Sequence, residues 1–143
     1  MAESKKDCLL VALGTRDGKT LTRGHFGDSS IFLIYELCEG AEPRFIEDRS
    51  NMPYEEKGHG DPGKARLMAG IMRDVDVLAG RIFGPNIQRM LQRFVAVRVR
   101  VDVVDEALPL LVEALPLLRQ AQETGPGRDL IVLPRGAEKG SAS

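Results

Sequence analysis

Hydrophobic residues in the first half of the chain form two continuous runs, followed by a more polar segment. Residues 8–13 and 31–37 are almost entirely apolar, which predicts two interior strands buried on both faces. Residues 43–49 begin with proline and carry several charges, as is typical of an edge strand. The turn-forming residues 39–42 join the second strand to the third, so these two strands are expected to form an antiparallel hairpin.

Helical spacing of apolar residues begins in the middle of the chain. Residues 61–62 are aspartate and proline, a good helix opening, and apolar residues then recur at helical spacing over 65–72. Residues 75–80 predict a fourth strand, and Gly-Pro at 84–85 opens a second helix that extends to residue 94. Valine alternates with more polar positions over 95–101, which predicts a half-exposed fifth strand at the second edge of the sheet.

A short repeat marks the last part of the chain. Glu-Ala-Leu-Pro-Leu-Leu occurs at 106–111 and again at 113–118, which predicts one amphipathic helix. Each proline removes a backbone hydrogen bond, so we expect this helix to be kinked or divided near Pro116. The glycines and proline of 125–127 end it.

Beyond this helix the pattern weakens. Residues 129–133 can add a short strand, and residues 136–143 are expected to be a disordered tail. We therefore assign residues 1–124 to a single ligand-binding α/β domain and residues 125–143 to a C-terminal extension.

Together these elements predict an α/β fold with helices on both faces of a five-stranded mixed sheet. The hairpin and the strand–helix–strand crossover give the order 3-2-1-4-5, with strand two antiparallel to the others. The carboxyl ends of strands one and four then lie side by side where the chain direction reverses. Because open α/β sheets bind ligands at such a point, we expect the functional site at this rim.

Two long loops at this rim carry the chain's two histidines, each preceded by glycine. His25 lies within 22–28, and His59 lies within 57–61. Histidine ligates metals or transfers protons near neutral pH, and glycine allows positive φ and a close approach to a ligand. We therefore expect both histidines to be metal ligands.

Further residues at the same strand ends complete the candidate site. The full cofactor-binding set consists of Arg16, Gly24, His25, Phe26, Gly27, His59, Arg81, Gly84 and Asn86. The helix N-termini near Asp61 and Pro85 can offer backbone N–H groups to an anion. A preassembled metal–sulfur cluster brings its own sulfides, so it needs only one or two protein ligands besides N–H and arginine donors.

Composition narrows the function classes. The 143 residues are 43% apolar and 29% charged, with a net charge of −1, as in an ordinary globular protein. A net charge near zero argues against nucleic-acid binding through a broad basic field. The sequence shows neither a membrane-spanning run nor the apolar run of a signal peptide. We therefore expect a cytoplasmic protein with no membrane partner.

The cysteines and two aspartates have plain structural interpretations. Cys8 begins the first apolar run and Cys38 ends the second. Two cysteines are too few for a disulfide framework or a four-thiolate site, so we expect small buried hydrophobes, with ligation of a soft metal as the alternative. Asp74 and Asp76 flank the start of the fourth strand and are predicted to be solvated turn residues.

Catalytic motifs are weak. Residues 80–84 lack the lysine and hydroxyl of a phosphate-binding loop, and the first strand has no acid that a two-metal nuclease would use. No third element identifies an activated nucleophile near His25. We therefore expect no enzymatic activity, and a small hydrolase or nucleotide-binding enzyme is the least favoured hypothesis.

A series of motifs runs through most of the chain. They are Thr-Arg-Asp-Gly at 15–18, His-Phe-Gly-Asp-Ser-Ser-Ile-Phe-Leu-Ile-Tyr at 25–35, Gly-His-Gly at 58–60, and the segments 75–80, 84–86 and 103–108. In this order they resemble the dinitrogenase iron–molybdenum cofactor biosynthesis family. That family includes NifX-like proteins, the C-terminal domain of NifB-like proteins and the orange proteins that hold a molybdenum–copper sulfide cluster.

The resemblance implies a three-layer, ribonuclease-H-like fold. It also implies a protein that binds, carries or stores a metal–sulfur cofactor or precursor, of iron–molybdenum or molybdenum–copper sulfide type, together with cofactor donor and acceptor proteins. His25 would be a ligand of the cluster or a hydrogen-bond donor to it, assisted by His59 and Arg81. We expect a monomer or a weak dimer. The alternative function is a non-catalytic protein-interaction module that uses the leucine-rich 106–118 helix.

Overall fold

The computed structural model describes residues 8–51 and 62–135, and within them the chain forms one six-stranded mixed sheet. The strands are β1 (Cys8–Thr15), β2 (Ile31–Cys38), β3 (Arg44–Ser50), β4 (Val77–Gly80), β5 (Val95–Val99) and β6 (Ile131–Leu133). The helices are the 3₁₀ turn η2 (Phe26–Asp28) and α1 (Pro62–Ile71), α2 (Ile87–Leu91), α3 (Val104–Glu113) and α4 (Leu115–Thr124). None of the described helices is both long and apolar enough to span a membrane.

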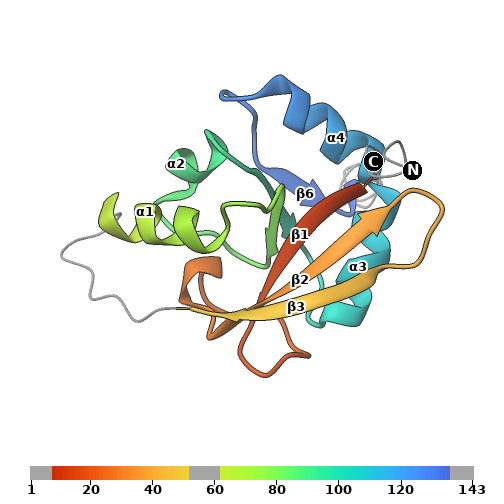
Figure 1. Cartoon of the computed structure of the whole chain (residues 1–143), viewed down its shortest axis with the longest axis horizontal. Helices are drawn as coiled ribbons and strands as arrows, with labels where there is room; N and C mark the ends of the chain where they lie inside the picture. The colour runs from red at the N-terminus through yellow and green to blue at the C-terminus, as the bar shows by residue number, and fades with distance from the viewer. Residues whose placement is uncertain (1–7, 52–61, 136–143) are drawn as a thin grey trace, which may run out of the picture.

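The strand order is β3-β2-β1-β4-β5-β6 (Figure 1). β2 is antiparallel to both β1 and β3, whereas β1, β4, β5 and β6 pair in parallel. The predicted order of the first five strands and the single reversed strand are therefore confirmed.

The predicted second edge of the sheet was wrong. β5 is buried at every position except Arg98, because β6 pairs along its outer side, with Val97 opposite Ile131 and Val99 opposite Leu133. Alternation within 95–101 indicates which faces of a strand are exposed, but it carries no information about pairing with a strand at 131–133. The sheet thus has six strands rather than five, and the strand that 129–133 was expected to add is its last.

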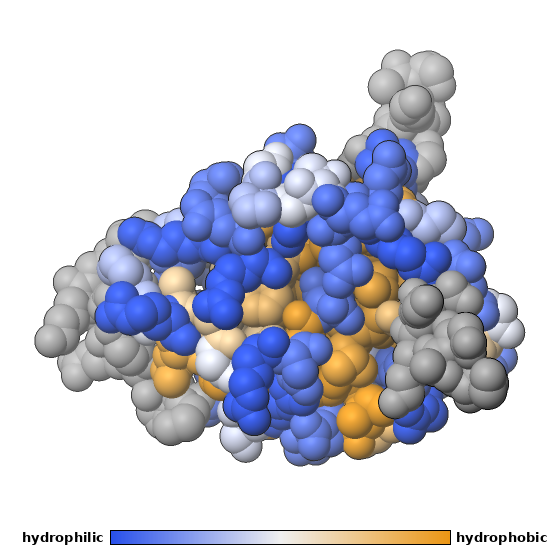
Figure 2. All heavy atoms as spheres, turned by 45° about the horizontal axis from the view of Figure 1, so that its top comes forward, coloured by the Kyte–Doolittle hydropathy of each residue, from blue (hydrophilic) through white to orange (hydrophobic). Residues whose placement is uncertain are grey.

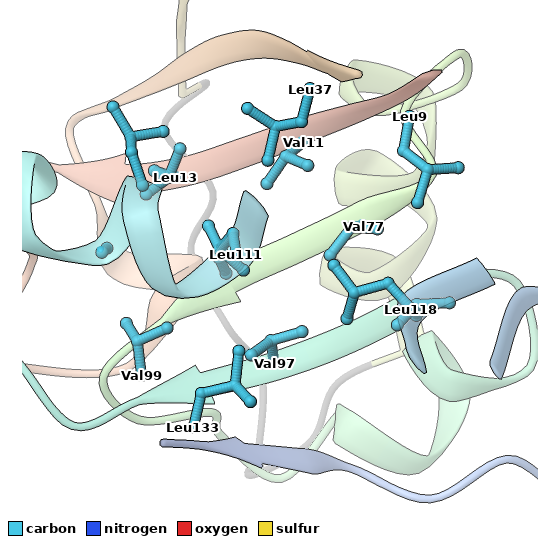
Figure 3. Packing of buried hydrophobic residues seen from close by; sticks show 14 of the residues in the cluster. Leu9, Val11, Leu13, Leu37, Val77, Val97, Val99, Leu111, Leu118 and Leu133 are labelled. Carbon is cyan, nitrogen blue, oxygen red and sulfur yellow. The ribbon is translucent and has the colours of Figure 1, made fainter. Parts of the chain in front are cut away.

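Helices cover the sheet on both faces (Figure 1). Residues of α3 and α4 pack with one set of strand side chains, and Leu111 and Leu118 lie over β1, β4 and β5 in Figure 3. Residues of α1 and α2, including Met68 and Met90, pack with the other set. Strands β1 and β4 contribute to both clusters, which is why their sequences are apolar without alternation.

The leucine-rich segment forms two helices rather than one. α3 ends at Glu113 and α4 begins at Leu115, which confirms the predicted division near Pro116. Pro116 lies in the first turn of α4, where its missing N–H leaves no intrahelical bond unmade. The second predicted helix is shorter than expected, because α2 spans only Ile87–Leu91 and its N-cap is Asn86 rather than Gly84.

The apolar side of this helix pair faces the core. Leu108, Leu111, Leu115 and Leu118 are all buried, so these leucines do not form the partner-binding surface that the interaction-module alternative requires. The surface shown in Figure 2, in which the top of Figure 1 comes forward, is mostly hydrophilic, with hydrophobic residues visible in recesses between polar ones.

The interpretation of the cysteines as unbonded buried hydrophobes was wrong, because Cys8 and Cys38 form a disulfide. They lie directly opposite each other on β1 and β2, with a Cα–Cα distance of 4.1 Å. Each of them is half-buried. Counting cysteines could not reveal this pairing, since it depends on the register of two strands.

Asp76 is not the solvated turn residue that was predicted. Its carboxylate accepts hydrogen bonds from the Leu10 backbone N–H, at 2.8 Å, and from the Gln122 side chain, at 2.8 Å. It thereby ties β1 and α4 to the start of β4. Burial raises the pKa of Asp76 above its ordinary value of 3.8, and the two hydrogen bonds offset this only in part. Asp74, half exposed, instead pairs with Arg49.

Breaking the disulfide is expected to destabilise the fold. The bond closes a loop with a sequence separation of 30, and the lost loop-closure entropy corresponds to about 3.6 kcal/mol of unfolding free energy. Denaturant unfolding of the oxidised and the reduced protein measures the difference. The Cys8→Ser/Cys38→Ser double variant is the control and should not respond to reductant. Equal stability of oxidised and reduced wild type would contradict the expectation.

The pH dependence of stability should distinguish the two aspartates. The folded state holds the Asp76 proton more tightly than the unfolded chain does, so stability relative to Asp76→Asn should fall as pH rises from 3.8 through the raised pKa. The Arg49 guanidinium lowers the pKa of Asp74, so stability relative to Asp74→Asn should be complete above 3.8 and lost as pH falls through the lowered pKa. Thermal unfolding at several pH values measures both differences. A stability difference between wild type and Asp76→Asn that does not change with pH would show that Asp76 is solvated, as the sequence predicted.

Candidate functional site

The His-Phe-Gly segment crosses the carboxyl end of β4. His25 forms a parallel bridge with Ile82, and the Phe26 N–H donates to the Ile82 carbonyl at 2.7 Å. The loop that follows β1 is therefore fastened to the loop that follows β4. This is the point in the sheet where the chain direction reverses, as the sequence predicted.

Phe26 anchors this segment. Its ring is 1% exposed and lies 5.0 Å from the Phe32 ring and 5.2 Å from the Phe83 ring, measured between centroids. A Cβ on Gly80 would come within 3.0 Å of Phe26 Cδ1, so the ring requires the bare backbone of the last residue in β4. Phe26 is thus a packing residue beneath the site and is not available to touch a ligand.

A set of short polar contacts fixes the turn η2. The Thr22 hydroxyl donates to Ser29 Oγ at 2.7 Å, and the Ser29 hydroxyl donates to the Phe26 carbonyl at 2.8 Å. The Asn51 amide donates to the carbonyls of Gly27 and Ser29 at 2.9 and 2.8 Å. Sequence reasoning missed Asn51, because only the β2–β3 register brings residue 51 beside residue 30.

The His25 imidazole projects from this fixed turn. Its side chain is 44% exposed, and a Cβ on Gly84 would lie 2.8 Å from Nδ1 and 3.2 Å from Cγ. Asp28 Oδ2 lies 3.9 Å from Nδ1, too far for a hydrogen bond. The Nδ1 side of the ring therefore lies against the Gly84 backbone. A residue with a side chain at position 84 would displace the ring from this position.

A pocket opens beside this ring, between η2, α1 and α2. It encloses about 60 Å³ and is open to solvent, so it can surround part of a ligand, the rest of which would lie in the open mouth. Its lining is His25, Gly27, Asp28, Lys64, Ala65, Met68, Phe83, Gly84, Pro85, Asn86, Ile87 and Met90. The pocket is therefore apolar on its helical walls and polar near the imidazole.

Three side chains give the pocket its chemistry besides His25. Lys64 Nζ lies 2.8 Å from Asp28 Oδ1, so the two charges offset each other at the rim. Met68 and Met90 are 3% and 9% exposed and bring thioether groups to the wall. Sequence reasoning placed both methionines on apolar helix faces and missed Lys64. Nothing in the spacing of 64 and 28 signals that they meet.

The structure brings some predicted residues together and separates others. His25, Gly27, Gly84 and Asn86 line the pocket, whereas Arg16, Gly24, Phe26 and Arg81 do not. Arg16 is exposed, and Arg81 lies 3.1 Å from Asp102 in an ion pair outside the pocket. Predicted ligand His59 and helix-capping Asp61 lie outside the described residues.

Two of these residues differ from their predicted roles. Gly24 does not take positive φ, and a Cβ there would meet nothing within 4 Å, so its conformational freedom is not used. Asn86 is 8% exposed, and its side-chain oxygen accepts a hydrogen bond from Arg89 at 2.7 Å. Asn86 therefore holds the start of α2 as well as lining the pocket.

The turn that carries His25 lies at the switch point of the mixed sheet, which is the place where open α/β folds bind ligands. The model of the dinitrogenase iron-molybdenum cofactor family matches residues 7–114, and the chain belongs to that family. Membership implies a role in the biosynthesis or binding of the iron–molybdenum cofactor. A comparison with curated proteins returned no match.

Adding a methyl group at Gly84 is expected to displace the imidazole with little loss of stability. The new Cβ would meet Nδ1 at 2.8 Å, but the half-exposed ring can rotate outward, so Gly84→Ala should cost less than about 1 kcal/mol. Gly80→Ala is the matched control. Its Cβ would press on the buried Phe26 ring, and it should cost about 1–3 kcal/mol.

Denaturant unfolding and the NMR resonances of the His25 ring measure the two effects. If the ring resonances of Gly84→Ala match those of wild type, the ring does not depend on the Gly84 backbone.

Proposed function

We propose that this protein binds and carries a metal–sulfur cofactor or cofactor precursor, of iron–molybdenum or molybdenum–copper sulfide type, and that it does not catalyse a reaction. The observation that carries the proposal is the pocket in which the His25 imidazole is the exposed nitrogen donor. Family membership supplies the chemical class of the cargo, and the pocket supplies a place for it.

The donor set of the pocket suits a cluster better than a bare ion. A bare transition-metal ion usually requires three or four protein ligands, and among the described lining residues His25 is the sole imidazole and no cysteine is present. A preassembled cluster satisfies most of its metals with its own sulfides. One protein ligand then suffices to hold and orient it.

The local geometry favours Nε2 as the ligand atom. Nδ1 rests against the Gly84 backbone and faces Asp28, whereas Nε2 is the ring nitrogen that neither residue approaches. Proteins usually orient a histidine ligand by a hydrogen bond to its other nitrogen, whereas here the contact of Nδ1 with the Gly84 backbone limits the ring position. The turn contacts of Thr22, Ser29 and Asn51 hold the ring's backbone in place.

The walls of the pocket are compatible with a sulfide-rich, anionic cargo. Thioethers such as those of Met68 and Met90 are soft and polarisable and suit sulfide-rich surfaces. Lys64 supplies an ammonium N–H donor at the rim, which its ion pair with Asp28 positions there. The exposed carboxylate of Asp28 is offset by the same ion pair.

A carrying role also agrees with the polar groups that the pocket contains. The described lining includes no serine, threonine or cysteine, the residues whose hydroxyl or thiol groups serve as nucleophiles in hydrolases. Its mouth is open to solvent, as loading and release require. The proposal therefore includes a donor and an acceptor protein that contact the rim formed by η2 and the start of α2.

Replacing His25 should abolish loading while the fold survives. The test is an NMR titration of the ligand-free protein with tetrathiomolybdate, with and without copper. Wild type should show backbone amide shifts confined to 25–28, 64–68 and 83–90, and His25→Ala should show none. Because the side chain is half exposed, the variant should keep its thermal stability within about 1 kcal/mol.

Arg16→Ala is the matched control, since Arg16 is exposed and lies outside the pocket. It should load as wild type does. Undiminished loading of His25→Ala would remove the site assignment, and shifts scattered over the surface of wild type would remove the proposal that this pocket holds the cargo.

A further inference from the structure

A second group of metal-ligating side chains lies at the other end of the sheet. The sulfur atoms of Cys8 and Cys38 and a carboxylate oxygen of Glu36 all lie within 4.8 Å of one another. Cys8 begins β1, whereas the His25 pocket lies beyond its end at Thr15. At about 3.3 Å per residue, the length of β1 separates the two sites by roughly 23 Å. The group therefore serves neither the His25 pocket nor its cargo.

The backbone presets this arrangement. Cys8 faces Cys38 across the β1–β2 ladder, and Glu36, two residues before Cys38, projects from the same face of β2 because side chains alternate along a strand. Both strands lie inside the sheet, between β3 and β4. The three ligand atoms are thus carried by two rigid, directly paired strands (Figure 1).

Arg44 holds the third ligand in position. It lies opposite Glu36 on β3, and its Nε and a terminal nitrogen donate to Glu36 Oε1 at 3.1 and 2.7 Å. Neither hydrogen bond uses Oε2. Arginine contacts of this kind orient a ligating carboxylate and leave its other oxygen for a metal.

We infer that the reduced form of this protein binds a thiophilic divalent ion of the zinc group through Cys8, Cys38 and Glu36, and that the disulfide excludes the ion. Thiolate and carboxylate ligands are those that zinc and cadmium take in proteins. Two sulfurs on one tetrahedral zinc lie about 3.8 Å apart, so after reduction the site needs only a small opening between facing strands.

The charges of the loaded site balance. Two thiolates, one carboxylate and one divalent ion sum to −1, and the Arg44 guanidinium brings the group to zero. The fourth position belongs to water, which can reach it because both cysteines and Glu36 are only half-buried. A site with three protein ligands and one water is a common zinc arrangement.

The redox step is thiol–disulfide exchange. A dithiol reductant breaks the Cys8–Cys38 bond, forms its own disulfide and leaves two protein thiols. Binding of the ion then releases two protons, one from each thiol, to solvent. Reoxidation by a disulfide oxidant reverses the first step. It releases the ion, because the two thiolates that bound it become the neutral sulfurs of a disulfide.

The test uses the full chain, reduced with a phosphine, freed of reductant under anaerobic conditions and titrated with Cd²⁺ alone. Reduced wild type should bind one equivalent with a thiolate-to-cadmium ultraviolet band, and oxidised wild type should show no band. Cys8→Ser and Cys38→Ser should each lose the band. Glu36→Gln should weaken binding by about tenfold or more, the usual effect of losing a metal-site partner.

Two controls separate this site from other features of the chain. Glu39 is an exposed acid that directly follows Cys38 and pairs with Arg119. The Glu39→Gln variant should bind Cd²⁺ as wild type does. His25→Ala should also bind normally, because the proposal is independent of the cofactor pocket. A His25→Ala variant that loses the band would contradict this independence.

The site assignment is overturned if reduced wild type shows no saturable band, if Cys8→Ser retains it, or if Glu36→Gln binds as tightly as wild type. Loss of structure in a cysteine variant does not obscure the result, because ¹¹³Cd NMR of loaded wild type reports the number of thiolate ligands directly. A shift that corresponds to two thiolates supports the site, and one that corresponds to none refutes it.

Discussion

The close approach of the His-Phe-Gly turn to the ends of β1 and β4 is the constraint on which the site depends. A Cβ on Gly14 would clash with Ser29, and one on Gly80 would press on the Phe26 ring. Because Gly14 and Gly80 have no side chains, Phe26 can pack in the core, and its neighbour His25 is then placed at the rim. The His25 imidazole is thus positioned by packing, which is stiffer than a solvated loop.

The division of the core into two faces explains where the pocket lies. α3 and α4 close one face of the sheet with aliphatic side chains, whereas α1 and α2 close the other with methionines and phenylalanines. The pocket forms where α1 and α2 diverge above the turn. The methionines that line the pocket therefore also pack in the core on that face.

The two ends of β1 have different chemistries. One end presents an imidazole beside an open pocket, and the other presents a disulfide beside a carboxylate that an arginine orients. A continuous interior strand links them. Asp76 adds to the rigidity of the disulfide end, because its carboxylate joins the backbone of β1 to α4. The two groups of side chains are thus held apart by the length of one interior strand.

Local apolar periodicity and turn chemistry were enough to predict the order of the first five strands, the hairpin and the reversed strand. They also predicted the division of the C-terminal helix and the position of His25 at the switch point. The tertiary structure was needed to show that β6 pairs with β5, that Cys8 meets Cys38, that Asp76 is half-buried, and that Lys64, Met68 and Met90 line the same pocket as His25. Each of those facts depends on the register or contact of segments far apart in the chain, which no local pattern encodes.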